Sequence, residues 1–136
     1  MESHLTEGDI ATAIYKTGKY IGEIIGKNQK NTHVIVKILA VLTHPMQGDL
    51  HQPAKANVPL FHERKALSFN EKANIPLSHV KLYNGKIPDY SMSLLEALTL
   101  QKNELTKENS PWALKSLEAL RKLEEETYKL NLTEDF

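Results

Sequence analysis

The sequence predicts an α+β protein in which short β-strands come first and two helices come last. From residue 8 to about residue 83, β-branched and aromatic residues gather in short runs separated by Gly, Asn, Pro and Asp. After residue 89 leucines recur at helical spacing. We therefore expect a β-domain over residues 1–86 and a helical hairpin over residues 87–136.

The first expected elements form a β-hairpin followed by a long strand. Residues 10–15 alternate in the manner of a strand, Thr17-Gly18-Lys19 supplies a reversal, and a second β-prone run covers residues 20–25. A polar turn at residues 26–31 leads into residues 33–42, which are apolar on both alternating faces. Such a pattern is typical of a central strand that is buried on both sides.

Residues 44–59 are expected to form a long ordered loop, because three prolines deprive the segment of ladder donors and bulky apolar side chains are few. Two further short strands are expected at residues 65–69 and 80–83. Five strands with short links and one long insertion would close into a small, partly open SH3-like β-barrel. The 1–86 domain is thus an SH3-like barrel with a long His- and Pro-containing loop.

The helical part is predicted from capping residues and leucine spacing. Asp89 can cap a helix that runs to about Lys107, and Ser110-Pro111 is an N-cap followed by a first-turn proline. The buried face of the first helix is either Met92, Leu95, Leu98 and Leu105 or Leu94, Leu98 and Leu105; that of the second is Leu114, Leu117, Leu120 and Leu123.

Composition excludes several classes of protein. Seventeen Lys and Arg balance 17 Asp and Glu, so the strong positive field of a non-specific nucleic-acid binder is missing. The chain has no cysteine, which excludes disulfides, thiolate zinc sites, a thiol nucleophile and lipid attachment through cysteine. Without a signal peptide or a membrane-length apolar run, we expect a cytoplasmic protein that does not insert directly into the membrane.

Polar residues of the long loop are the main candidates for a functional site. Imidazole and carboxylate side chains could bind a metal, could satisfy the backbone of the proline-rich loop, or could form a recognition surface. Their spacing matches no established metal motif, so we expect no metal centre and no cofactor; His44, His51 and His62 would be the ligands if one exists. The loop candidates are His44, Asp49, His51, His62, Glu63 and Arg64.

Three aromatic residues complete the candidate binding surface. Tyr15 and Tyr20, near Lys16 and Lys19, could grip a peptide or RNA, although a solvated face with half-buried tyrosines is the simpler interpretation. Trp112 could be an exposed interface anchor or could pack the hairpin onto its neighbour.

No nucleophile elbow, Walker pattern or dinucleotide fingerprint occurs, so we do not expect an enzyme. Two alternatives stay open. One is an RNA- or nucleoprotein-binding SH3-like module, since Lys and Arg outnumber Asp and Glu by 11 to 7 over residues 1–88. The other is a metal-dependent hydrolase that uses the clustered histidines and carboxylates of the loop.

Several segments resemble the kinase-associated protein B family. They are Gly8–Glu23, Leu39–Pro45, Gln47–His51, Phe61–Leu67, Ile87–Tyr90, Ser110–Trp112 and Ser116–Leu117, so the resemblance covers nearly all of the chain from about Gly8 to Glu125.

The resemblance implies a regulatory accessory protein of a membrane-bound sporulation sensor histidine kinase in spore-forming bacilli, required for that kinase to feed phosphate into the sporulation phosphorelay. The partner would then be a protein, with no nucleic acid, and the kinase would recruit the chain to the inner face of the membrane. Members are sometimes called lipoproteins, yet this sequence has no cysteine to acylate. The resemblance supplies no functional residues.

Overall fold

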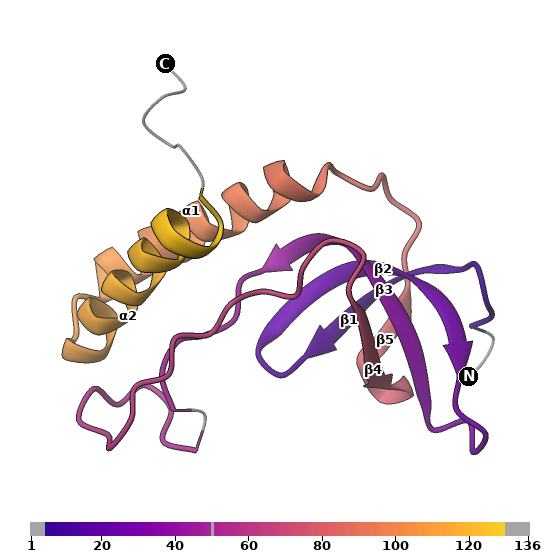
Figure 1. The fold of residues 1–136 in the computed structure, drawn as a ribbon, viewed down its shortest axis with the longest axis horizontal. Coiled ribbons are helices and arrows are strands. Elements are labelled where there is room, and N and C mark those ends of the chain that lie inside the picture. Colours follow the sequence, from indigo (N-terminus) through magenta and orange to yellow (C-terminus); the bar gives the residue numbers. More distant parts are fainter. Residues whose placement is uncertain (1–4, 50, 130–136) are drawn as a thin grey trace. The chain divides into compact units, whose positions relative to one another are not determined.

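The computed structural model describes residues 5–49 and 51–129, and it contains one antiparallel sheet followed by helices. The strands are β1 (Ile10–Tyr15), β2 (Gly18–Lys27), β3 (His33–Thr43), β4 (Lys72–Pro76) and β5 (Val80–Leu82). They form a five-stranded sheet in the order β4-β3-β2-β1-β5 (Figure 1). The helical elements are η1 (Leu77–His79), α1 (Tyr90–Glu108), α2 (Pro111–Lys122) and the π-helical turn η2 (Leu123–Thr127).

The β1–β2–β3 meander confirms the predicted hairpin and the predicted central strand, but the predicted reversal at Thr17-Gly18-Lys19 is wrong because Gly18 and Lys19 already pair with β1. β1 and β2 pair from Ile10 opposite Glu23 to Tyr15 opposite Gly18, so the two-residue turn is Lys16-Thr17. Gly22 leaves no room for a side chain between β2 and β3, because a Cβ atom there would stand 2.6 Å from the carbonyl oxygen of Lys37. Register shifts accompany this close approach and bend the sheet.

The predicted strand at residues 65–69 is wrong, and the fourth strand lies at Lys72–Pro76 instead. At Leu67 two tyrosines replace a neighbouring strand: its amide donates to the Tyr20 hydroxyl at 3.2 Å, and its carbonyl accepts from the Tyr90 hydroxyl. Because side chains satisfy this backbone, the segment needs no ladder partner. β4 escaped prediction since only Ala73 and Ile75 mark its buried face.

β5 returns to the far edge of the sheet and pairs with β1, so the last strand of the domain lies beside the first. The 3₁₀ turn η1 makes the sharp change of direction between β4 and β5. The strands form an open antiparallel sheet whose edge strands are β4 and β5, and with the helices that follow it this confirms the expected α+β class. The core consists of aliphatic side chains from the central strands, among them Ile21, Ile24, Val36 and Ile38.

The first helix starts where the sequence predicts. The Asp89 carboxylate accepts from the amide of Met92 at 3.1 Å, as an N-cap should. Of the two proposed faces the structure selects Leu94, Leu98 and Leu105, whereas Met92 is exposed. No helix in the described part of the chain is long and apolar enough to span a bilayer.

The second helix is capped as predicted but buries a different face. The Ser110 hydroxyl accepts from the amide of Ala113 at 3.0 Å, and Pro111 occupies the first turn. Of the predicted leucine stripe, Leu120 and Leu123 are buried, Leu117 is half-buried and Leu114 is exposed. Small residues and the tryptophan complete the buried side, which comprises Trp112, Ala113, Ser116, Ala119 and Leu120.

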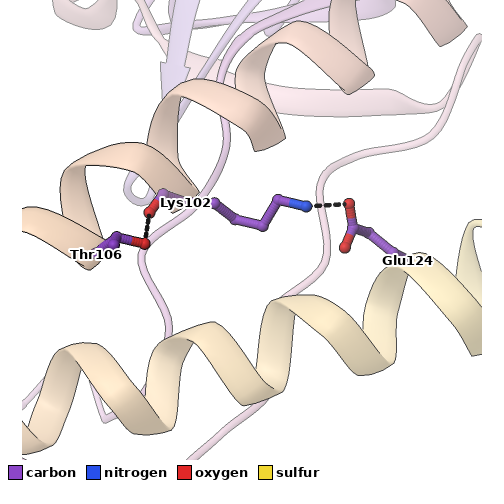
Figure 2. A network of polar contacts seen from close by, with 3 residues as sticks. All are labelled: Lys102, Thr106 and Glu124. Carbon is purple, nitrogen blue, oxygen red and sulfur yellow. Dashed lines mark hydrogen bonds and ion pairs between the residues drawn. The ribbon is translucent and has the colours of Figure 1, made fainter. Parts of the chain in front are cut away.

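An ion pair joins the C-terminal part of α1 to η2. Figure 2 shows the Lys102 ammonium reaching across to the Glu124 carboxylate, at 2.8 Å, while the hydroxyl of Thr106 donates to the carbonyl of Lys102. Glu124 is buried, so the pair is shielded from water on the carboxylate side. Together with buried Leu105 and Leu120, it confirms a helical hairpin.

The chain divides into two compact units, and the division differs from the expected one at residues 86 and 87. The first unit contains the sheet with Ala66–Ala97, and the second contains Met46–Lys65 with the chain from Leu98 onward. The long loop therefore groups with the helices. Side chains of α2 bind its backbone. The sequence does not reveal this, because the loop follows the strands directly along the chain.

We expect Lys102→Met to lower the free energy of unfolding by about 2 kcal/mol, because it leaves the buried Glu124 carboxylate without its cation. Replacing both partners by methionine should restore part of that loss. Urea denaturation of the single and double variants measures both effects. If the double variant loses more free energy of unfolding than the two single variants lose together, the ion pair is contradicted.

Burial raises the pKa of Tyr90 to about 12 and also raises the pKa of Tyr20 above its ordinary value. The folded protein thus favours the neutral phenols, and this stabilisation, complete below pH 10, should be lost as the pH rises towards 12. In a phenolate absorbance titration, Tyr90→Phe should remove the step near pH 12. Loss of stability between pH 10 and 12 should be smaller in Tyr90→Phe than in the unaltered protein.

Candidate functional site

Most of the predicted site residues lie in the segment Met46–Lys65, which belongs to the same unit as α2. Residues 46–49 and 51–65 of this segment form no helix and no strand, so their backbone cannot rely on a regular hydrogen-bond ladder. Long segments of this kind in compact proteins are usually functional. How this one is held determines what it can present to a partner.

The Gln47 side chain acts as a substitute strand partner for Arg64. Its amide nitrogen donates to the carbonyl of Arg64 at 2.8 Å, and its amide oxygen accepts from the backbone nitrogen of Arg64 at 2.9 Å. The Arg64 guanidinium returns a 2.7 Å bond to the carbonyl of Gly48, whose own amide donates to the carbonyl of His62. These four bonds join the two ends of the segment.

Trp112 and Phe61 pack against this junction. The Trp112 indole donates to the carbonyl of Gln47 at 3.1 Å, and the side chain is only 8% exposed. Gly48 has a φ of +100°, and a Cβ atom there would meet the Phe61 ring at 3.1 Å and the indole nitrogen at 3.4 Å. Only glycine fits both the backbone conformation and the space.

Lys115 attaches the middle of the segment to α2. Its ammonium donates to the carbonyl of Ala56 at 3.1 Å and lies 5.3 Å from the centre of the Phe61 ring. One cation therefore satisfies a loop carbonyl and stacks on an aromatic face. Because Trp112 and Lys115 are spaced three residues apart on one helix, they reach adjacent parts of the segment.

The loop candidates fall into two groups. His44 is buried, and its Nδ1 donates to the carbonyl of Pro45 at 3.1 Å, while Arg64 is half-buried with its guanidinium on a backbone carbonyl. Asp49 accepts from the amide of His51 at 2.9 Å and so shapes a local turn. The side chains that face solvent are those of His51, His62 and Glu63.

The aromatic candidates also separate. Tyr20 is in the core of the sheet, where its hydroxyl holds Leu67, and Trp112 lies beneath the long segment. Tyr15 is half-buried at the hairpin turn with the ammonium of Lys16 5.5 Å from its ring. Burial gives Tyr20 and Trp112 internal partners and leaves Tyr15 as the accessible aromatic.

Among residues 5–49 and 51–129, no group of three His, Asp or Glu side chains could bind one metal ion. Gln47, Asp49 and Arg64 bind backbone atoms, as in the interpretation in which polar side chains satisfy the loop backbone. The side chains of His51, His62 and Glu63 face solvent.

Sequence reasoning missed Gln47, Phe61 and Lys115, which do most of the positioning. Gln47 finds its partner 17 residues away and Lys115 finds Ala56 at a separation of 59, so no local spacing could identify either contact. One signal was available at Gln47-Gly48, since a polar residue beside a glycine within a proline-rich segment is typical of a turn that must be held.

Comparisons with known proteins agree on one family. A family model described as "Kinase associated protein B" matches residues 15–128. Among curated proteins, "Kinase-associated lipoprotein B" of Bacillus subtilis (strain 168) is 50% identical over 121 residues, which cover 89% of this chain and 93% of the relative. A crystal structure of kinase-associated protein B from Bacillus cereus superposes with a TM-score of 0.77 at 44% identity and covers 93% of this chain and 99% of that one.

Gly48→Ala should lower the free energy of unfolding by about 2 kcal/mol, since the positive φ and the Phe61 ring both oppose a methyl group. It should also shift the emission of Trp112, the single tryptophan, to longer wavelength as the indole loses its buried hydrogen bond. Gly26→Ala is the control, because a Cβ there meets only the Ile35 side chain at 3.8 Å. Equal stability of the two variants would show that the Gly48 junction is not a constraint.

Proposed function

The chain belongs to the kinase-associated protein B family, and from that premise we propose that it is a non-enzymatic accessory protein that binds a sensor histidine kinase. The kinase would be the membrane-bound sensor that feeds the sporulation phosphorelay. The chain would act in the cytoplasm, without a cofactor, and would reach the inner face of the membrane through the kinase.

The observation that carries the proposal is the way the long segment is held. Its polar side chains bind backbone atoms, at Gln47, Asp49 and Arg64, and do not converge on a common point. These hydrogen bonds fix the conformation of the loop. A docking surface requires this, because a partner then binds without first ordering a loop. The name kinase-associated, carried by the family and by its relatives, supplies the kind of partner.

Activation by an accessory protein follows from differential affinity. If the chain binds the active conformation of the kinase more tightly than the inactive one, binding shifts the population towards the active state. A tenfold difference in affinity corresponds to about 1.4 kcal/mol, which two or three good side-chain contacts can supply. The chain would need no chemistry of its own.

Titrating the purified chain into the cytoplasmic part of its cognate sporulation kinase should give saturable binding and a changed rate of autophosphorylation. Calorimetry measures the first and transfer of labelled phosphate from ATP measures the second. The cytoplasmic part of an unrelated histidine kinase is the control.

Binding with an unaltered phosphorylation rate, at a stoichiometric excess of the chain, would contradict direct activation but would still support association with the kinase. No binding to the cognate kinase would contradict the proposal as a whole.

A further inference from the structure

We propose that residues 52–60 form a strap that opens while the rest of the second unit stays folded, and that the Lys115 side chain holds this strap closed. The inference goes beyond the proposed function, because it concerns a conformational device and not a partner. It follows from the way the middle of the long segment is attached, which differs from the way its ends are attached.

The two ends of the segment are joined to each other by several hydrogen bonds. The side chain of Gln47 makes two bonds to the backbone of Arg64. The guanidinium of Arg64 binds the carbonyl of Gly48, and the amide of Gly48 binds the carbonyl of His62. The buried indole of Trp112 donates to the carbonyl of Gln47 at the same junction. The middle of the segment can therefore move between two fixed ends.

The middle of the segment is attached at one point. Among the residues that the structure describes, the 3.1 Å bond from the Lys115 ammonium to the carbonyl of Ala56 is the only hydrogen bond that joins residues 52–60 to a helix or a strand. None of residues 51–60, all of which are described, is buried, and only Ala56 and Val58 are half-buried. A segment that buries so little apolar surface opens locally at a small cost in free energy.

Two features lower the cost of opening further. Ala54 has a φ of 61°, a conformation that is strained for a residue with a Cβ atom, and a released strap can relieve this strain. In the closed state the Lys115 ammonium binds Ala56 and lies 5.3 Å from the centre of the Phe61 ring. Exposed Glu118 follows Lys115 at the i,i+3 spacing at which opposite charges on a helix attract. Once the strap is released, the ammonium therefore has a carboxylate within reach.

Limited digestion of the full chain with trypsin measures the opening, because the cleavage site after Lys55 lies within the strap. When opening is fast compared with cleavage, the cleavage rate follows the population of the open state. Lys115→Met keeps the apolar part of the side chain and removes its charge. It should speed cleavage after Lys55 by about fivefold, the effect expected from the loss of one hydrogen bond. Lys115→Arg can still donate to Ala56 and stack on Phe61, so it should restore slow cleavage.

Two controls separate opening of the strap from unfolding of the whole unit. Lys122→Met removes another exposed lysine of α2 and should change the rate of cleavage after Lys55 by less than about twofold. In Lys115→Met, cleavage after Lys102, inside α1, should keep its original rate. The emission of Trp112 should also keep its wavelength, because the indole binds the fixed end of the segment at Gln47.

Faster cleavage after Lys55 in Lys115→Met, but not in Lys115→Arg or Lys122→Met, would support the role of Lys115. An unchanged rate in Lys115→Met, or an equally fast rate in Lys115→Arg, would overturn it, since the charge would then not hold the strap. Equal acceleration of cleavage after Lys55 and Lys102, with a shifted Trp112 emission, would also overturn it, because the whole unit would have loosened. None of these measurements involves the kinase, so their result is independent of the proposed function.

Discussion

The pairing of the Gln47 side chain with the backbone of Arg64 is the interaction on which the candidate site depends. A segment without helix or strand has to satisfy its backbone groups in some other way, and here an amide side chain supplies both a donor and an acceptor to one residue. The bond from Arg64 to Gly48, and the indole of Trp112 on Gln47, then fix the same junction from two further directions. This closure holds the two ends of the segment, and Lys115 holds its middle.

The same solution recurs in the first unit. Leu67 has no strand beside it, and the hydroxyls of Tyr20 and Tyr90 occupy its amide and its carbonyl. Burial raises the pKa values of both phenols, so they stay neutral to higher pH, and a neutral hydroxyl can donate as well as accept. In each unit, therefore, buried polar side chains take the place of a β-ladder where the chain leaves regular structure.

These arrangements bear on the proposed function because they fix the shape of the long segment in advance. In the loop, the side chains of Gln47, Asp49 and Arg64 bind backbone atoms, whereas those of His51, His62 and Glu63 face solvent. A surface fixed in advance loses little conformational entropy on association, so modest contacts suffice for a regulatory complex. A family named for its association with a kinase calls for this kind of surface.

The sequence by itself determined the class of fold, the β1–β2 hairpin, the central strand and both helix starts, because alternation, turn residues and N-caps are set by near neighbours. It also selected the loop that contains most of the candidate site. It could not place β4, where only Ala73 and Ile75 mark a buried face. Nor could it identify the exposed side of α2, because Leu114 is an apolar residue of the kind usually found in a core and yet is exposed. Gln47, Phe61 and Lys115 were out of reach since their partners lie far along the chain. Local spacing predicts what a segment can form, whereas burial and long-range hydrogen bonds exist only once distant segments have packed together.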